Sequence, residues 1–226
     1  MLVKYWMSRP VITVDAEDTV QTARDRIITH DIFALPVVRN GRLAGLISEA
    51  ELYRASTQGE FDLPVVELPA AIASKPVETV MRPTPPTVPP DYTMEEAADI
   101  MLKKRVKTLT VVASQDSPVG VVTRSDVLKV IIALTGVARK GVQYALQVED
   151  RPRSIQEITD TIHSYGGRMV SILTSNTSAP AGYRKAYIRM YGIDRFNLRR
   201  LNEALAQKFD VIYVLEKLEI RRETGG

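Results

Sequence analysis

The sequence predicts an α+β protein: two β-α-β-β-α units packed as a pair, followed by one β-α-β-β-α-β unit. The first observation behind this prediction is an internal repeat with a spacing of 74 residues, which becomes 75 after a hairpin. Its clearest matches pair Met7 with Met81, Thr19 with Thr93, Leu35 with Leu109, and Gly45 with Gly120. The second observation is that a different strand and helix pattern follows residue 140. A single repeat would leave an apolar sheet face exposed, so two repeats are expected to pack together.

Composition and charge narrow the class of protein. The 226 residues are 45% hydrophobic and 25% charged, which is typical of a globular chain with a real core. There is no cysteine, no signal-like N-terminus and no apolar run of membrane-spanning length. The net charge is only +3 and no basic run stands out. We therefore expect a cytoplasmic protein that uses neither membrane nor nucleic acid as a partner.

Each repeat is expected to contain a strand, a helix, a hairpin and a second helix. In the first repeat, residues 11–14 form the strand, Thr19 caps the helix, and Asn40-Gly41 turns between strands at 35–38 and 43–47. A proline-containing connector follows, with a helical turn at residues 70–73. The second repeat starts with five prolines between Pro83 and Pro90, which should hold Thr87 and Val88 extended as its first strand.

The end of each hairpin carries a hydroxyl and a carboxylate in a shared spacing. Thr123 and Asp126 follow the strand that ends at Val122, and Ser48 and Glu51 occupy the equivalent positions of the first repeat. A helix start offers free N–H groups to a phosphate, and a carboxylate one turn later suits two vicinal hydroxyls, so this spacing favours a nucleotide. The alternative is a helix-capping box, in which the same side chains satisfy their own backbone.

The repeat resembles a tandem pair of cystathionine-β-synthase (CBS) domains, or Bateman module. The resemblance is carried by the stretches Met7–Val14, Leu35–Val38, Gly45–Glu51, Met81–Pro83, Leu109–Val112 and Gly120–Asp126. It implies binding of AMP, ADP or ATP in clefts between the repeats, with S-adenosylmethionine as an alternative ligand.

The resemblance also assigns roles to individual residues. Thr123 and Ser48 would contact phosphate, while Asp126 first, and then the longer Glu51, would hold the ribose. Val37 and Val111 would flank the base, Thr13 and Thr87 could face the nucleotide, and Arg124, Arg82 or Arg9 would neutralise phosphate. Thr110 stands where the first repeat has Pro36, which would alter the wall against the base.

The last part of the chain resembles an ACT domain, which has a ferredoxin-like β-α-β-β-α-β order. Strands are expected at residues 142–148, 169–173, 186–191 and 211–215, and Pro152 is placed to start the first helix. The resemblance is carried by Gln147–Pro152 and Ser164–Ser171. ACT domains commonly bind amino acids through a turn ending in glycine, but Arg153 occupies that position here.

Together these features resemble the acetoin-utilisation protein family AcuB of bacteria. The predicted boundaries are a first CBS unit at 1–59, a connector at 60–76, a second CBS unit at 77–135, a linker at 136–141, an ACT-like domain at 142–216 and a tail at 217–226. We expect a regulatory homodimer without catalytic residues, metal site or required cofactor, which relays its ligand state through the ACT domain to a regulated enzyme. The alternative class is a dimerisation scaffold with degenerate clefts.

Overall fold

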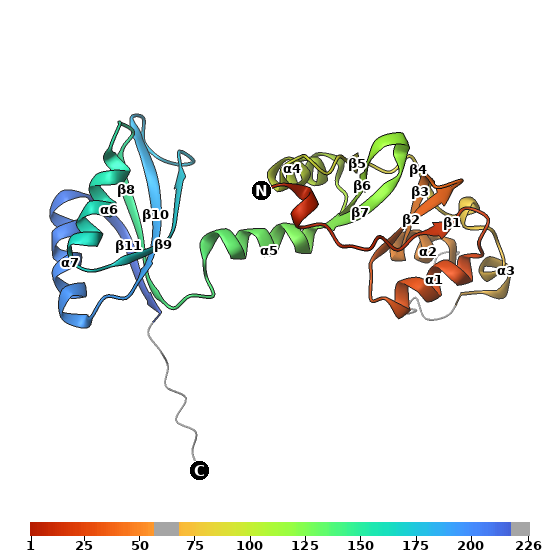
Figure 1. Cartoon of the computed structure of the whole chain (residues 1–226), viewed down its shortest axis with the longest axis horizontal. Coiled ribbons are helices and arrows are strands. Elements are labelled where there is room, and N and C mark those ends of the chain that lie inside the picture. Colours follow the sequence, from red (N-terminus) through yellow and green to blue (C-terminus); the bar gives the residue numbers. More distant parts are fainter. Residues whose placement is uncertain (57–67, 218–226) are drawn as a thin grey trace, which may run out of the picture. The chain divides into compact units, whose positions relative to one another are not determined.

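The computed structural model describes residues 1–56 and 68–217 and divides the chain into two compact units (Figure 1). The N-terminal unit ends at Val130 and holds both sequence repeats, and the C-terminal unit begins at Ile131. The predicted C-terminal end of the first CBS unit, the start of the connector, and the tail after Lys217 lie outside the described residues. No helix in the part of the chain that is described is long and apolar enough to span a membrane.

Both repeats have the predicted β-α-β-β-α order. The first contains β1 (Val14–Asp15), α1 (Val20–Thr29), β2 (Ala34–Arg39), β3 (Arg42–Ser48) and α2 (Glu49–Ser56). The second contains β5 (Thr87–Val88), α4 (Met94–Lys104), β6 (Thr108–Val112), β7 (Pro118–Thr123) and α5 (Arg124–Thr135). In each repeat the first strand pairs parallel with the second, and the second pairs antiparallel with the third. Thr19 and Thr93 cap their helices as predicted.

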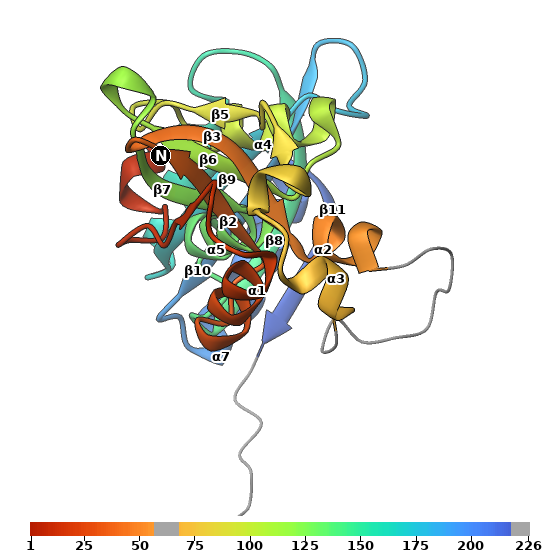
Figure 2. The same ribbon diagram turned by 90° about the vertical axis from the view of Figure 1, so that its right-hand side faces the viewer.

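The remaining elements of this unit are short. Between the repeats lie α3 (Ala70–Ala73), η2 (Val77–Thr79) and β4 (Arg82–Pro83), while η1 (Val3–Tyr5) precedes the first repeat and η3 (Ser114–Asp116) lies between β6 and β7. The predicted helical turn at 70–73 is therefore confirmed, and α1 contacts both α2 and α3 (Figure 2). The strand predicted at 11–14 is shorter and later, because only Val14 and Asp15 pair with β2.

The segment that precedes each repeat packs on the other repeat. Val3 and Met7 belong to the hydrophobic core of the second repeat, and Ser8 bridges to Val121 of β7. In return, Val77 is buried in the core of the first repeat, and β4 extends the sheet of that repeat beside β3. The two repeats thus exchange their N-terminal segments, and each core contains residues that precede the other repeat.

Two glycines make this exchange sterically possible. A Cβ atom on Gly45 would collide with the Met81 sulfur and lie 2.9 Å from the carbonyl oxygen of Arg82. A Cβ atom on Gly120 would lie 2.5 Å from the Met7 sulfur. Equivalent contacts thus occur twice: Gly45 of the first repeat packs against Met81, and Gly120 of the second repeat packs against Met7. Because the approach is this close, a side chain at Gly45 would displace β4, and one at Gly120 would displace the Met7 side chain.

The C-terminal unit has the predicted β-α-β-β-α-β order. Its elements are β8 (Gly141–Glu149), α6 (Ser154–Ser164), β9 (Arg168–Ser175), β10 (Tyr183–Tyr191), α7 (Arg195–Lys208) and β11 (Asp210–Lys217). The sheet order is β11-β8-β10-β9 with all neighbours antiparallel. Ile158 and Ile162 of α6 and Leu201 of α7 share one core with alternate residues of β8, so both helices cover the same sheet face (Figure 1).

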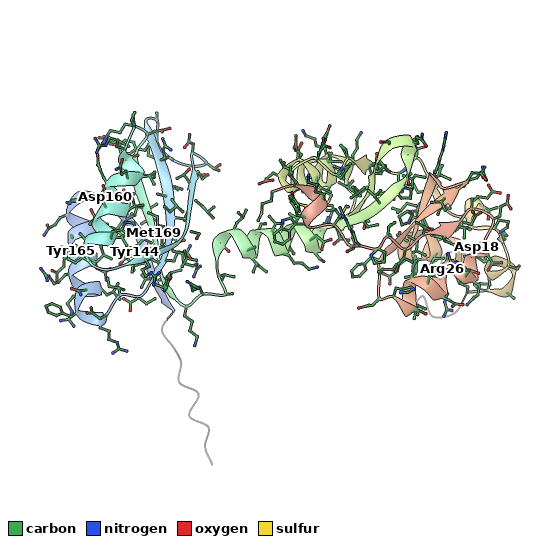
Figure 3. The ribbon with its side chains drawn as sticks, viewed as in Figure 1. Asp18, Arg26, Tyr144, Asp160, Tyr165 and Met169 are labelled. Carbon is green, nitrogen blue, oxygen red and sulfur yellow. The ribbon has the colours of Figure 1, made fainter. Side chains whose placement is uncertain are left out.

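Tyr144 and Arg153 of this unit occupy unusual environments. Tyr144 of β8 is fully buried on the helix-covered face and donates a hydrogen bond of 2.6 Å to Asn202 (Figure 3). Helix α6 begins at Ser154 and not at Pro152, because Arg153 adopts a left-handed conformation with φ 70° and interrupts the helical backbone. This is the position where the ACT resemblance predicts glycine, and the conformation explains that preference.

Candidate functional site

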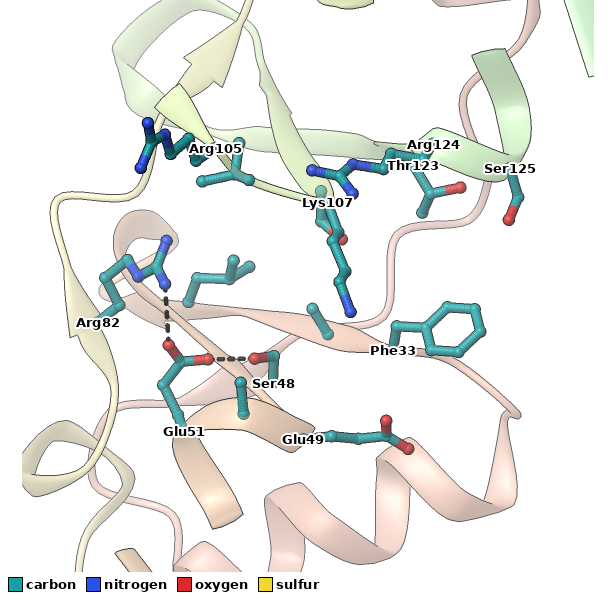
Figure 4. Close-up of a pocket in the computed structure, with 15 residues that line it drawn as sticks. Phe33, Ser48, Glu49, Glu51, Arg82, Arg105, Lys107, Thr123, Arg124 and Ser125 are labelled. Atoms are coloured by element: carbon teal, nitrogen blue, oxygen red, sulfur yellow. Dashed lines mark hydrogen bonds and ion pairs between the residues drawn. The ribbon is translucent and has the colours of Figure 1, made fainter. Parts of the chain in front are cut away.

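A cavity of about 420 Å³ lies between the strand–helix corners of the two repeats (Figure 4). The first repeat contributes the start of β2 and the β3–α2 corner, and the second contributes the start of β6 and the β7–α5 corner. Equivalent positions of the repeats line it in pairs: Phe33 and Lys107, Ala34 and Thr108, Ser48 and Thr123, Glu49 and Arg124, and Ala50 and Ser125. The cavity therefore belongs to the pair and not to either repeat alone.

Four basic residues line this cavity. Arg82 comes from β4, whereas Arg105, Lys107 and Arg124 all come from the second repeat. Arg82 lies 3.3 Å from a carboxylate oxygen of Glu51. Within residues 1–56 and 68–217, no carboxylate lies within 4.0 Å of Arg105, Lys107 or Arg124. One side of the cavity thus presents positive charge that no carboxylate of the described residues pairs with at that distance.

Glu51 is the buried carboxylate of the cavity wall. Its side chain is only 3% exposed, and it accepts hydrogen bonds from the Ser48 hydroxyl and from Arg54. The nearby Arg82 supplies a second positive charge. Two guanidinium groups and a hydroxyl offset the cost of burying the carboxylate, so Glu51 is not open to a ribose unless one of these partners moves.

Asp126 does not line the cavity, although it is the residue that the sequence favours first. Its carboxylate accepts hydrogen bonds from the backbone N–H of Thr123 at 2.9 Å and from the Thr123 hydroxyl at 2.8 Å. Its other oxygen binds the ammonium group of Lys129 at 2.9 Å. The backbone N–H of Asp126 donates to the Thr123 hydroxyl at 3.3 Å. This reciprocal arrangement is the capping-box alternative, so the favoured ribose role of Asp126 lacks an open carboxylate.

The predicted wall against the base also lies elsewhere. Val37 and Val111 are fully buried in the hydrophobic cores of their repeats. Successive side chains of a strand point to opposite faces, and the cavity instead contacts Ala34 and Thr108, on the other face of the same strands. Both faces of β2 are apolar in sequence, so its pattern could not tell which one meets the cavity, whereas β6 carries Thr108 and Thr110 on the face that meets it.

The remaining predicted residues divide between the cavity and other surroundings. Ser48, Glu51, Thr123 and Arg124 line the cavity, whereas Thr13 and Thr87 do not. The Thr13 carbonyl accepts a hydrogen bond of 2.7 Å from Arg26, which also lies 3.4 Å from Asp18 (Figure 3). Of the three arginines proposed to neutralise phosphate, Arg82 and Arg124 line the cavity. Arg9 is exposed outside it.

Phe33, Lys107 and Arg105 are among the cavity residues that the sequence interpretation missed. They precede the second strand of each repeat, in a segment that the spacing marks only as a helix end. The available signal was divergence between the copies, since Phe33 aligns with Lys107. A neighbouring side chain, Thr110, lies on the same face of β6 as Thr108, and its fully buried hydroxyl has no hydrogen-bond partner among the described residues.

The CBS domain family matches this chain twice, at residues 3–57 and 77–133. A CBS domain-containing protein of Dictyostelium discoideum is 32% identical over 135 residues, which cover 58% of this chain and 92% of that protein. An inosine-5'-monophosphate dehydrogenase of Korarchaeum cryptofilum is 33% identical over 119 residues. That match covers 53% of this chain, which spans only 22% of the length of the dehydrogenase.

Two solved structures resemble the N-terminal unit. The CBS domain pair of protein MJ0100, in complex with 5'-methylthioadenosine and S-adenosyl-L-methionine, gives a TM-score of 0.50 at 26% identity, covering 62% of this chain and 98% of that one. AcuB from Vibrio cholerae, assigned to acetoin utilization, gives a TM-score of 0.51 at 27% identity, covering 61% of this chain and 95% of that one. The resemblance of the C-terminal unit to ACT domains stays a prediction. The chain belongs to the CBS domain family and carries two CBS domains in tandem.

Proposed function

We propose that the CBS pair is a regulatory, non-catalytic sensor that binds an adenine nucleotide, AMP, ADP or ATP, in the cavity between the two strand–helix corners. The observation that carries this proposal is the set of Arg105, Lys107 and Arg124 around the cavity, without a carboxylate within ion-pair distance in the described parts of the chain. Charge-assisted bonds from such groups to phosphate oxygens are stronger than bonds between neutral groups.

The proposal assigns the phosphates to these cations and not to Thr123 at the start of α5, because the Thr123 hydroxyl already donates its proton to Asp126. Ser48 lines the cavity at the equivalent corner, where its hydroxyl donates to Glu51. Glu51 is the carboxylate that would reach the ribose, after exchanging its bond with Arg82 for one with the ligand. Arg82 would then bind the phosphates, and this contact would replace its ion pair with Glu51.

A second candidate ligand is S-adenosylmethionine, because the MJ0100 pair binds this molecule together with 5'-methylthioadenosine. Both ligands share the adenosine group with the nucleotides and lack phosphate. A sulfonium cation would be repelled by Arg105, Lys107 and Arg124, so the charge of the cavity favours the nucleotide. The third reading is a dimerisation scaffold. The occupied carboxylates of Glu51 and Asp126 are the observation in its favour.

The wider functional context is also part of the proposal. The C-terminal unit has the element order of an ACT domain, and we propose that it relays the ligand state of the CBS pair to a regulated enzyme. A homodimer and a cytoplasmic location complete this proposal. No further cofactor is required for a sensor of this kind.

Thermal unfolding of the full chain with AMP, ADP, ATP and S-adenosylmethionine tests the function. A ligand at 100 times its Kd stabilises the folded state by about 2.7 kcal/mol and raises the Tm. We expect the nucleotides to raise the Tm, with GTP and inorganic phosphate as controls for the adenine base and for simple anion binding. A rise with S-adenosylmethionine alone would support the second candidate. If no adenosyl ligand raises the Tm, the dimerisation scaffold is the interpretation that remains.

A further inference from the structure

We infer that the cavity binds one nucleoside polyphosphate in one orientation, with the base on the first-repeat side against Phe33 and the phosphate chain on the second-repeat side. This inference rests on the proposed nucleotide function and adds the class and direction of the ligand. It rests on the side chains at equivalent positions of the two repeats. The backbones match at these positions, but the side chains are neutral or acidic in the first repeat and basic in the second.

Equivalent positions of the cavity differ in charge. Phe33 of the first repeat corresponds to Lys107 of the second, and Glu49 corresponds to Arg124. All four line the cavity, so one half presents an aromatic ring and an acid while the other presents two cations. A ligand with a neutral end and an anionic end meets complementary charge in one orientation and a repelling carboxylate in the other.

The third cation extends this basic side. Arg105 follows α4 with a left-handed backbone, φ 54°, and the equivalent Asp31 of the first repeat has φ 49°. The two repeats therefore share the turn and differ in the sign of its side chain. Figure 4 shows Lys107 and Arg124 reaching into the space between the repeats, with Arg105 farther along the same side. A chain of two or three phosphates offers more negative charge and more oxygen atoms to these three cations than a single phosphate does.

Phe33 supplies the surface for the base. Its side chain lines the cavity while the residue is 62% exposed, so the ring is accessible to a ligand. Figure 4 places it across the cavity from Arg105, at the end nearer Thr123. Base stacking on an aromatic ring tolerates any base, so this contact gives affinity without distinguishing adenine from guanine. It replaces the buried Val37 and Val111 as the flanking apolar group.

Isothermal titration calorimetry of AMP and ATP against the full chain tests the inference through the ratio of the two affinities. We expect one site per chain and ATP binding at least about tenfold more tightly than AMP, because the added phosphates meet additional cations. The Lys107→Gln variant should lower this ratio by about tenfold or more. The matched Lys104→Gln variant removes an exposed cation that does not line the cavity and should leave the ratio within about twofold.

Two further variants separate the base from the phosphates. Phe33→Ala should weaken AMP and ATP by the same factor, about tenfold, and so leave their ratio unchanged. Glu49→Gln removes the exposed acid that corresponds to Arg124 and should strengthen ATP more than AMP. A gain of affinity cannot result from misfolding, and the Tm of each variant is recorded beside it.

Three results would overturn the inference while leaving the nucleotide function intact. They are equal affinities of AMP and ATP, two equivalent sites per chain, and equal effects of Lys107→Gln and Lys104→Gln on the ratio. Failure of both nucleotides to bind the wild-type chain would instead remove the proposed function together with the inference.

Discussion

Replacing Gly45 by alanine tests the exchange of segments that brings Arg82 to the cavity. The added methyl group would collide with the Met81 sulfur and lie 2.9 Å from the Arg82 carbonyl oxygen. Gly45 pairs with Pro83, and Leu46 with Arg82, so the collision falls on the pairing of β3 with β4. The methionine side chain can turn away, but the carbonyl oxygen can move only if β4 moves.

The expected cost follows from this difference. Adding a methyl group to a packed core costs about 1–3 kcal/mol, and replacing glycine by alanine returns about 0.4–1 kcal/mol through the unfolded chain. We expect Gly45→Ala to lower the free energy of unfolding by about 2 kcal/mol. At Gly120 the three nearest atoms all belong to the Met7 side chain. Gly120→Ala should therefore cost less, about 1 kcal/mol or below.

Urea unfolding followed by tryptophan fluorescence measures these costs directly, because Trp6 is the single tryptophan and packs against the core of the second repeat. Double-mutant cycles with Met7→Ala and Met81→Ala then identify the colliding atoms. Removing the Met7 side chain should cancel the penalty of Gly120→Ala. Removing the Met81 side chain should cancel only part of the penalty of Gly45→Ala, since the Arg82 carbonyl oxygen remains.

The reasoning would be refuted if Gly45→Ala were as stable as the wild type. It would also fail if neither cycle showed coupling between the glycine and its methionine. A displaced β4 also carries Arg82 away from Glu51. Gly45→Ala should therefore weaken ATP binding more than Gly120→Ala does, measured by calorimetry on the folded variants.

Four other substitutions test separate parts of the structure. Asp126→Ala should lower the free energy of unfolding by about 1–3 kcal/mol in urea titrations, because it leaves the buried capping groups unpaired. The same variant should change ATP affinity in calorimetry by less than about twofold. Thr110→Val should raise the unfolding free energy by about 1 kcal/mol in the same titrations, because it removes a buried hydroxyl that has no partner in residues 1–56 and 68–217. A decrease would show that the hydroxyl is satisfied. Arg153→Gly should stabilise the C-terminal unit by about 0.5–1 kcal/mol through relief of its left-handed backbone, as followed by circular dichroism, whereas Arg153→Ala should not. Burial raises the pKa of the Tyr144 hydroxyl, so the unfolded chain loses this proton near pH 10 while the folded chain keeps it. The wild type should therefore lose stability more steeply than Tyr144→Phe as the pH rises above about 10. Parallel stability profiles of the two proteins against pH would contradict this.

Local features of the fold could be predicted because they depend on neighbours in sequence. Thr19 and Thr93 cap helices through their own following turn, and their spacing is visible in the chain. The order of strands and helices in all three units follows from the same kind of local pattern. The exchange of Met7 and Met81 could not be predicted, because the repeat spacing is identical whether each methionine packs on its own repeat or on the other.

The candidate site was predicted in part for a related reason. Thr123 and Asp126 have one spacing that suits both a nucleotide and a capping box, and only the hydrogen bonds in the folded chain distinguish the two. Val37 lies in the core and Ala34 lines the cavity, which the sequence could not show because both faces of β2 are apolar. Lys107 carries no motif of its own, and its role emerges only when the structure sets it across the cavity from the first repeat.

A crystal structure of the full chain grown with ATP tests the central claim most directly. The account predicts one nucleotide in the cavity, with phosphate oxygens within hydrogen-bonding distance of Lys107 and Arg124 and the base against Phe33. An ATP molecule bound elsewhere, or phosphates placed beside Glu49 with the base toward Lys107, would contradict it.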